Sequence, residues 1–386
     1  MNNQRKNYVD IVRGIAIILV VFGHAGYPEY LGRFASFFHV PVFFFLSGLF
    51  YSDVYSLRPH LLIVKRLRSL YLPFVAYQVL FLMFHNEFFT LHLYSKDISV
   101  AGEYVRYYMP HDYLIALLHI LTFGCTQQAI WGLWYLQSIF TVTILFLAVS
   151  WFGSNQPAAY EKWRFAGVYG IFSVGLLLIA NGITLPRSLT TSFISLPFFY
   201  FGFLYKRHEA DIPIHAAGLF VAVLLLALSA VLYDDRISLA NNHLVSFPYF
   251  LLNALLGIYA VVCFSKLVAG RFNCSVLRFI GEKSLHILVL HILAFRSIAC
   301  LQIAILDYPI QWLGKYPVID ATGGWWFVYG VTGVTIPVLV CYGARVIRRV
   351  SPIVFWSRWC YTKIRSRVPV LNMFFKDYLT TKLWFT

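Results

Sequence analysis

The stretch from Tyr8 to Gly26, "YVDIVRGIAIILVVFGHAG", is long and apolar enough to cross a bilayer, which takes about 17–25 mostly apolar residues. It also contains three ionisable side chains, those of Asp10, Arg13 and His24. Such groups are costly in hydrocarbon and commonly have a function there. The stretch therefore predicts a membrane helix that does more than anchor the chain.

Helical geometry places two of these groups on one face. Arg13 and His24 are 11 positions apart, which is about 20° past three full turns and about 16 Å along the helix axis. Asp10 precedes Arg13 by three positions and can form an ion pair with it. A purely structural alternative for His24 is a hydrogen bond to a neighbouring backbone carbonyl, but a guanidinium and an imidazole on one face favour function.

The composition predicts an all-α, polytopic membrane protein. Of its 386 residues, 60% are hydrophobic and 12% are charged, and the mean hydropathy is +0.69, whereas soluble domains are about 45–50% apolar and about 25% charged. A shorter apolar piece at 111–124 is interpreted as interfacial or re-entrant. About ten ranges qualify as transmembrane helices: 10–28, 34–51, 70–89, 130–152, 164–183, 189–205, 214–233, 247–268, 283–306 and 325–347.

The basic residues predict the orientation of these helices. With the N-terminus inside, about 23 of the 31 Lys and Arg residues fall in inner segments and about 6 in outer ones. This asymmetry predicts that both termini are cytoplasmic. Anionic lipid headgroups account for the net charge of +15 more simply than nucleic acid does. We expect a transmembrane domain at 1–347 and a basic, aromatic cytoplasmic tail at 348–386.

The cysteines indicate neither a disulfide framework nor a metal site. None of the six belongs to a C-x-x-C pair, and most lie in or beside apolar runs, where cysteine behaves as a small hydrophobe. The basic residues before the first apolar run resemble the start of a signal peptide. The polar groups inside that run and the many spans after it favour a helix that is retained.

Two further stretches contain candidate site residues. "IVKRLRSLYLPF" (63–74) has Lys65, Arg66 and Arg68, which are either ordinary membrane anchors or, together with Arg13, a pocket for phosphates, because a guanidinium binds phosphate oxygens bidentately. "FHVPVFFFLSGLFY" (38–51) contains His39, a Pro41 that permits a bend, and Ser47–Gly48, which favour close helix packing or supply a hydroxyl.

Two later stretches complete the pattern. "WGLWYLQSIF" (131–140) places Trp131 and Trp134 near the outer interface, where an aromatic belt is the simple interpretation. "IGEKSLHILVLHI" (280–292) has His286 and His291 on different helix faces, since they are five positions apart, and His291 is the deeper of the two.

Together these stretches resemble the acyltransferase 3 family of integral membrane acyltransferases, over nearly the whole chain. Arg13 and His24 are similar to the Arg-x10-His element of that family, and "FHVPVFFFLSGLF" to its F-H-x-P-x-F-F-F-L-S-G stretch. "KRLRSLYLPF", "LWYL" and "IGEKSLHILVLH" resemble its basic third helix, its L-W-F-L and its late G-x-x-S-x-x-x-Y-x-x-H element. Two departures are the spacing of Arg66 and Arg68, where the family often has Arg-x-x-Arg, and Leu288, where Tyr is common.

The resemblance implies a reaction and its participants. The donor would be cytosolic acyl-coenzyme A, most often acetyl-CoA, and the acceptor a sugar hydroxyl of a surface polysaccharide such as the O-antigen of lipopolysaccharide, or its lipid-linked precursor. The protein would lie in a bacterial inner membrane, in contact with lipid, and would need no metal.

The resemblance also implies roles for individual residues. His24 would be the general base or would carry the acyl group, which suits imidazole because its unperturbed pKa is about 6.5. Asp10 would be the structural partner of Arg13. The expected substrate-binding residues are Arg13, Arg66 and Arg68 for the phosphates, Ser47 for the thioester or arm, and Trp134, His39 and His291.

Two other classes of function remain as alternatives. A transporter or flippase for a glycan or small solute would also contain buried His and Arg, but the halves of this chain show no inverted repeat. A purely structural membrane scaffold would not need charged groups along one helix face.

Overall fold

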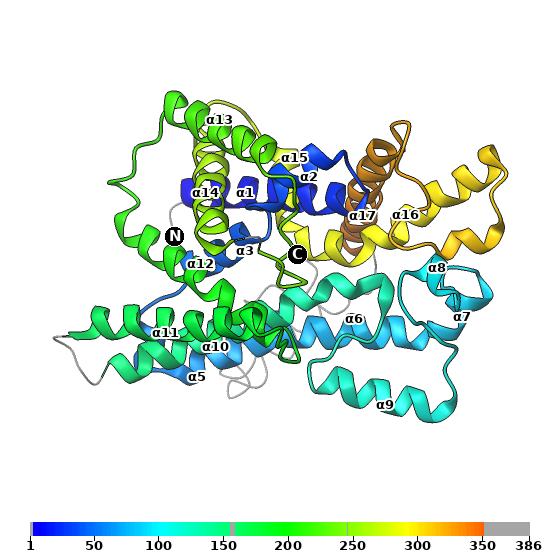
Figure 1. The fold of residues 1–386 in the computed structure, drawn as a ribbon, viewed down its shortest axis with the longest axis horizontal. Coiled ribbons are helices and arrows are strands. Elements are labelled where there is room, and N and C mark those ends of the chain that lie inside the picture. Colours follow the sequence, from blue (N-terminus) through cyan, green and yellow to red (C-terminus); the bar gives the residue numbers. More distant parts are fainter. Residues whose placement is uncertain (1–2, 155–158, 245, 351–386) are drawn as a thin grey trace. The chain divides into compact units, whose positions relative to one another are not determined.

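The computed structural model describes residues 3–154, 159–244 and 246–350. Within these ranges the chain is helical and has no strand; an isolated antiparallel bridge pairs Ser238 with His243. Figure 1 accordingly shows coiled ribbons joined by loops. The predicted all-α class is confirmed.

The helices follow one another with short connections. Those of the first third are α1 (Asn3–His24), α2 (Glu29–Ser36), α3 (Pro41–Leu49), α4 (Val54–Leu57), α5 (Pro59–Arg66), a π-helical turn (Leu67–Tyr71), α6 (Leu72–Met83), α7 (His85–Thr90), α8 (Ile98–Ala101) and α9 (Pro110–Leu121). The others are the 3₁₀ turn η2 (Gln128–Leu133), α10 (Trp134–Gly153), α11 (Tyr160–Ala180), α12 (Leu189–His208), α13 (Ala216–Leu232), α14 (Phe247–Ala269), α15 (Ser275–Glu282), α16 (Ser284–Leu306), η4 (Ile310–Gly314) and α17 (Trp325–Val350).

All ten predicted apolar ranges coincide with helices. Seven helices in the described residues are long and apolar enough to cross a membrane, and α13 is a shorter apolar helix. The ranges 70–89 and 189–205 form helices as well, but these are not among the seven. The short piece at 111–124 forms most of α9. The chain is therefore compatible with a multi-pass membrane protein.

Contacts divide the chain into two units, Met1–Val334 and Thr335–Thr386. The first contains every helix up to and including the start of α17. In the second, the described residues continue α17, with Pro337 inside the helix. The predicted tail at 348–386, with Cys360, lies almost entirely outside the described residues.

Glycine and proline residues end or distort the helices that matter for the site. α1 ends at His24 because Gly26 takes up a left-handed conformation, with φ of +78°. The second predicted range is divided into α2 and α3, and Pro41 is the first residue of α3, where a missing N–H costs nothing. Pro73 cannot donate to the carbonyl of Ser69, and just before it the chain forms the π turn.

Glycines bring α3 and α12 into contact. A Cβ at Gly48 would lie 1.8 Å from the carbonyl oxygen of Phe199, and one at Gly202 would lie 1.8 Å from that of Phe45. Since no larger residue fits at either position, Gly48 has the packing role predicted for it. The preceding residue, Ser47, is then directed toward a different side of α3.

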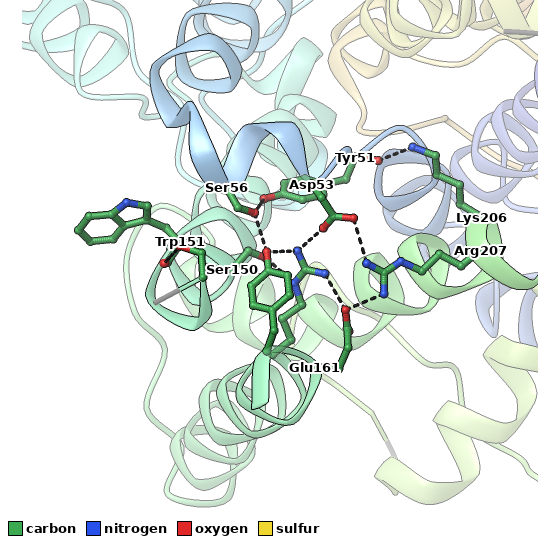
Figure 2. Close-up of polar contacts among 11 residues, drawn as sticks. Tyr51, Asp53, Ser56, Ser150, Trp151, Glu161, Lys206 and Arg207 are labelled. Atoms are coloured by element: carbon green, nitrogen blue, oxygen red, sulfur yellow. Dashed lines mark hydrogen bonds and ion pairs between the residues drawn. The ribbon is translucent and has the colours of Figure 1, made fainter. Parts of the chain in front are cut away.

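An ionic cluster around the buried Arg164 ties α10, α11 and α12 to the segment before α4. Arg164 is fully buried and donates to Ser150 Oγ (3.1 Å), Glu161 Oε1 (3.1 Å) and Asp53 Oδ1. Arg207 donates to Glu161 Oε1 at 2.6 Å and to Asp53 Oδ2 at 2.9 Å. Figure 2 shows Asp53 and Glu161 facing Arg207 across this cluster. Two carboxylates therefore balance two guanidiniums.

Candidate functional site

A cavity of about 410 Å³ lies inside the first unit, within the size range usual for a small-ligand site. Its wall comes from α1, α2, α3, the α5–π turn junction, α10, α16 and the hairpin-like loop before α14. Elements that are far apart in the sequence thus converge on one space. The lining includes Arg13, His24, Ser36, His39, Ser47, Arg66, Ser69, Trp134, Tyr135, Ser238, Ser284 and Leu288.

One face of α1 forms a long strip of this wall. Arg13, Ile17, Val20 and His24 all line the cavity, at the i, i+4, i+7 and i+11 positions of one helix face. The prediction that the guanidinium and the imidazole share a face is confirmed, and both open into the same cavity. The helix rise puts them about 16 Å apart along the axis.

Two guanidiniums meet the cavity at one end of this strip. Arg13 Nη1 donates to Asp10 Oδ1 at 3.2 Å, and its guanidinium lies 5.3 Å from the ring centre of Phe50. Arg66 Nε is buried and has no hydrogen-bond partner among the residues that the structure describes. Burial lowers the pKa of Arg66 below its ordinary value, and the nearby charge of Arg13 acts in the same direction. An anion bound here would relieve that repulsion.

The other end of the strip is an imidazole pair. His24 Nδ1 lies 2.6 Å from His291 Nε2, and His291 Nδ1 lies 3.1 Å from the carbonyl oxygen of Ile287. A third histidine, His39, lines the cavity and bonds through Nδ1 to the carbonyl oxygen of Ala35 at 2.6 Å. This end therefore contains histidine nitrogens that are fixed by their neighbours and placed beside a space large enough for a substrate.

Other parts of the wall contribute hydroxyls and aromatic rings. Ser47 of α3 and Trp134 of α10 both line the cavity, as do Ser36 and Tyr135. Residues 237–240 also line the cavity, and the hydroxyl of Ser238 is among their polar groups. The bridge between Ser238 and His243 holds this loop in shape.

The structure brings most of the predicted site residues together. Arg13, His24, His39, Ser47, Arg66 and Trp134 line one cavity, and Asp10 pairs with Arg13 as predicted. Arg68 is exposed and does not line the cavity, so the structure distinguishes it from Arg66. His291 contacts His24 rather than the cavity.

Several lining residues were not predicted. Tyr135 lies inside the quoted "LWYL" stretch, and Ser36 lies one helical turn before His39, so the spacing of the quoted motifs could have indicated both. The 237–240 loop has no such signal. Among the described residues no group of three or more His, Cys, Asp or Glu side chains could hold a metal ion.

The fold and the site define a helical, multi-pass membrane protein with an internal cavity that joins a cationic end to an imidazole pair. The model of the acyltransferase 3 family, described as an acyltransferase domain, matches residues 6–344 of the 386. The chain therefore belongs to this family and is a membrane acyltransferase. Searches among curated proteins and among solved structures give no match.

Proposed function

We propose that this protein is an O-acyltransferase that moves an acyl group, acetyl by preference, from cytosolic acyl-CoA to a hydroxyl of a bacterial surface polysaccharide or its lipid-linked precursor. One observation carries the proposal: a single cavity is lined at one end by Arg13 and Arg66 and at the other by His24. A transporter would not require an acyltransferase domain, and that domain covers most of this chain.

Arg13 and Arg66 suit the phosphates of coenzyme A. Guanidiniums form bidentate, charge-assisted hydrogen bonds with phosphate oxygens, and Arg66 Nε has no partner in the described part of the chain. The predicted orientation places this end on the cytoplasmic side, where acyl-CoA is found. The extended arm of the donor would then run along the α1 strip, past the Ser47 hydroxyl, toward His24.

His24 would act as the general base. The acceptor hydroxyl gives its proton to the imidazole while its oxygen attacks the carbonyl carbon of the thioester. The tetrahedral intermediate then breaks its C–S bond, and the departing coenzyme A sulfur takes the proton back from the imidazolium. The products are the ester and free coenzyme A, and His24 returns to its starting state. Positioned general acid–base catalysis of this kind contributes about 10²–10⁴-fold.

The acceptor would bind at the histidine end of the cavity. Trp134 offers an aromatic face against which the C–H face of a sugar ring can pack. His39 donates through Nδ1 to a backbone carbonyl, so its other ring nitrogen can accept a hydrogen bond from a sugar hydroxyl. Ser36 and Ser238 line the same cavity, and their hydroxyls can add further polar contacts.

The proposal is tested with purified protein in nanodiscs, [¹⁴C]acetyl-CoA and surface polysaccharide from cells that lack the gene. We expect His24→Ala to lower kcat by about 10²–10⁴-fold with no change in coenzyme A binding measured by calorimetry. His119→Ala, which changes an exposed histidine of α9, is the matched control and should retain activity. Transfer by His24→Ala at the wild-type rate would overturn the proposal.

A second measurement tests the acceptor and the acyl carrier together. Proton NMR of the surface polysaccharide should show O-acetyl signals in cells with the gene and none in cells without it. In the absence of acceptor, protein incubated with [¹⁴C]acetyl-CoA and quenched in denaturant should hold no label if His24 is a base. Label that disappears in His24→Ala would make His24 an acyl carrier instead.

A further inference from the structure

The imidazoles of His24 and His291 meet edge to edge. Their Nδ1 and Nε2 atoms are 2.6 Å apart, and the ring planes differ by 19°. The ring centres are 4.9 Å apart, which exceeds the N···N distance by about two ring radii. The rings therefore share nearly one plane with the two nitrogens between them. This is the geometry of a linear N–H···N hydrogen bond and not of a face-to-face stack.

The carbonyl oxygen of Ile287, which contacts His291, determines where the protons lie in this pair. His291 Nδ1 lies 3.1 Å from the carbonyl oxygen of Ile287, and a carbonyl can only accept. His291 Nδ1 must therefore carry the proton, which leaves Nε2 of a neutral His291 with a lone pair. That lone pair accepts the Nδ1–H of His24. The Nε2 atom of His24 is then unprotonated, which is the state that a general base needs.

His291 itself is held in place. It is 1% exposed, and its ring packs edge to face against Phe295, with ring centres 5.6 Å apart and planes at 86°. No carboxylate is hydrogen-bonded to either imidazole in the described part of the chain. A second histidine and a backbone carbonyl thus occupy the place where many enzymes use a carboxylate to orient a catalytic histidine.

We infer that His291 is a positioning residue, which holds His24 in the tautomer that leaves Nε2 free to take the acceptor proton. The inference rests on the function proposed above. When Nε2 takes that proton, the charge on His24 is stabilised by the hydrogen bond to His291 and by the carbonyl end of α1, since His24 is the last residue of that helix. No proton needs to move to His291. The sequence predicted a direct substrate contact for His291, but its side chain does not line the cavity.

The first test observes the tautomer without any reaction. Protein labelled with ¹⁵N-histidine is examined in lipid by solid-state NMR, and the His24 signals are assigned by their loss in His24→Gln. We expect a protonated Nδ1 and an unprotonated Nε2 for His24 in the wild type. His291→Leu removes the acceptor, so His24 should lose this pattern. A wild-type His24 protonated at Nε2 and unprotonated at Nδ1 would overturn the inference before any variant is made.

The second test separates positioning from folding and from substrate binding. His291→Leu should lower kcat by about 10²-fold or more, with the KM for acetyl-CoA unchanged, because the donor end is intact. His291→Gln, whose amide oxygen can accept from His24 Nδ1–H, should recover at least tenfold of that loss. The matched control is His286→Leu on the same helix, which should retain wild-type rates. The centre of the His286 ring lies 6.3 Å from that of Tyr77.

The outcomes for the two proposals are distinct. An active His24→Ala overturns the proposed function. An inactive His24→Ala with a fully active His291→Leu leaves that function standing and overturns the positioning role alone. Equal losses in His291→Leu and His291→Gln, with both variants melting at the wild-type temperature, would also overturn it, since restoring the acceptor would then have no effect.

Discussion

Two groups of arginines in this protein differ in how their donors are used. In the cluster of Figure 2, Arg164 and Arg207 share the carboxylates of Asp53 and Glu161, and the Arg164 guanidinium also lies over aromatic rings, 4.6 Å from that of Phe203. In the cavity, Arg13 has one carboxylate partner and Arg66 has none in the described part of the chain. The first group is charge-balanced, whereas the second has an excess positive charge.

The difference indicates which arginines hold the fold and which await a ligand. A buried guanidinium whose donors are taken by the protein ties helices together and has nothing left to offer. A guanidinium with free donors beside a cavity retains its attraction for an anion. By this criterion Arg164 is structural, whereas Arg66 is the arginine that we propose for substrate binding.

The largest effect is predicted for a variant that removes both carboxylates from the cluster of Figure 2. The double variant Asp53→Asn and Glu161→Gln leaves the Arg164 guanidinium fully buried without a carboxylate. We expect a loss of about 3 kcal/mol in stability, the lower end of the range for a buried charge that loses its partners, because Arg164 is buried but both carboxylates are about half exposed. The measurement is thermal unfolding in detergent, followed by tryptophan fluorescence.

Two companion variants sharpen this test. Asp211→Asn, which removes an exposed carboxylate near His208, should leave the melting temperature unchanged. Adding Arg164→Met to the double variant should recover part of the loss, because the unpaired charge is gone. A double variant that melts with the wild type would show that the carboxylates do not support Arg164.

The next largest effect concerns the donor end of the cavity. Arg66→Ala should raise the KM for acetyl-CoA by about 10- to 150-fold with little change in kcat, as expected from losing a charged hydrogen bond worth about 1.5–3 kcal/mol. Calorimetry with coenzyme A should show the same loss in affinity. Arg68→Ala is the matched control because Arg68 is exposed and does not line the cavity. Equal effects from both variants would contradict the distinction between them.

Arg13→Ala should have a smaller effect than Arg66→Ala. Asp10 already neutralises part of the Arg13 charge, and the Arg13 side chain is 34% exposed. We expect the KM for acetyl-CoA to rise by about 2- to 12-fold, which corresponds to about 0.5–1.5 kcal/mol. A coenzyme A titration at two salt concentrations checks the electrostatic origin, since the wild type should lose more affinity in high salt than the variant. An unchanged affinity would remove Arg13 from the donor site.

The sequence predicts the helices better than it predicts their contacts. All ten apolar ranges are helical, because hydropathy is a property of each segment alone. The alignment of Arg13 with His24 also follows from local helix geometry. The π turn before Pro73 and the division between α2 and α3 depend on how prolines disturb a helix. The hydropathy pattern of the sequence does not predict the local helix geometry at these two places.

The candidate site is predictable only in part for the same reason. The pairing of His24 with His291 joins residues 267 positions apart, which no local pattern fixes. The choice between Arg66 and Arg68 depends on helix phase next to the π turn, and the loop at 237–240 reaches the cavity through tertiary packing. Residues that share a helix could be placed together from the sequence, whereas partners on different helices could not.

The smallest predicted effect is a pH dependence of stability that comes from Asp53 in the cluster of Figure 2. Partial burial would raise the pKa of Asp53, but hydrogen bonds from Arg164 and Arg207 lower it below its ordinary value. A carboxyl whose pKa is lower in the folded state stabilises the fold above its unfolded pKa, about 3.9 for Asp, and this stabilisation is lost as the pH falls through the folded value. Because the Asp53 side chain is 49% exposed, we expect this contribution to stability to be less than about 1 kcal/mol.

The measurement is the difference in melting temperature between the wild type and Asp53→Asn. This difference should be constant from about pH 5 to pH 7 and should narrow below about pH 4. A difference that stays the same down to pH 3 would show that the ionised carboxylate of Asp53 does not stabilise the cluster.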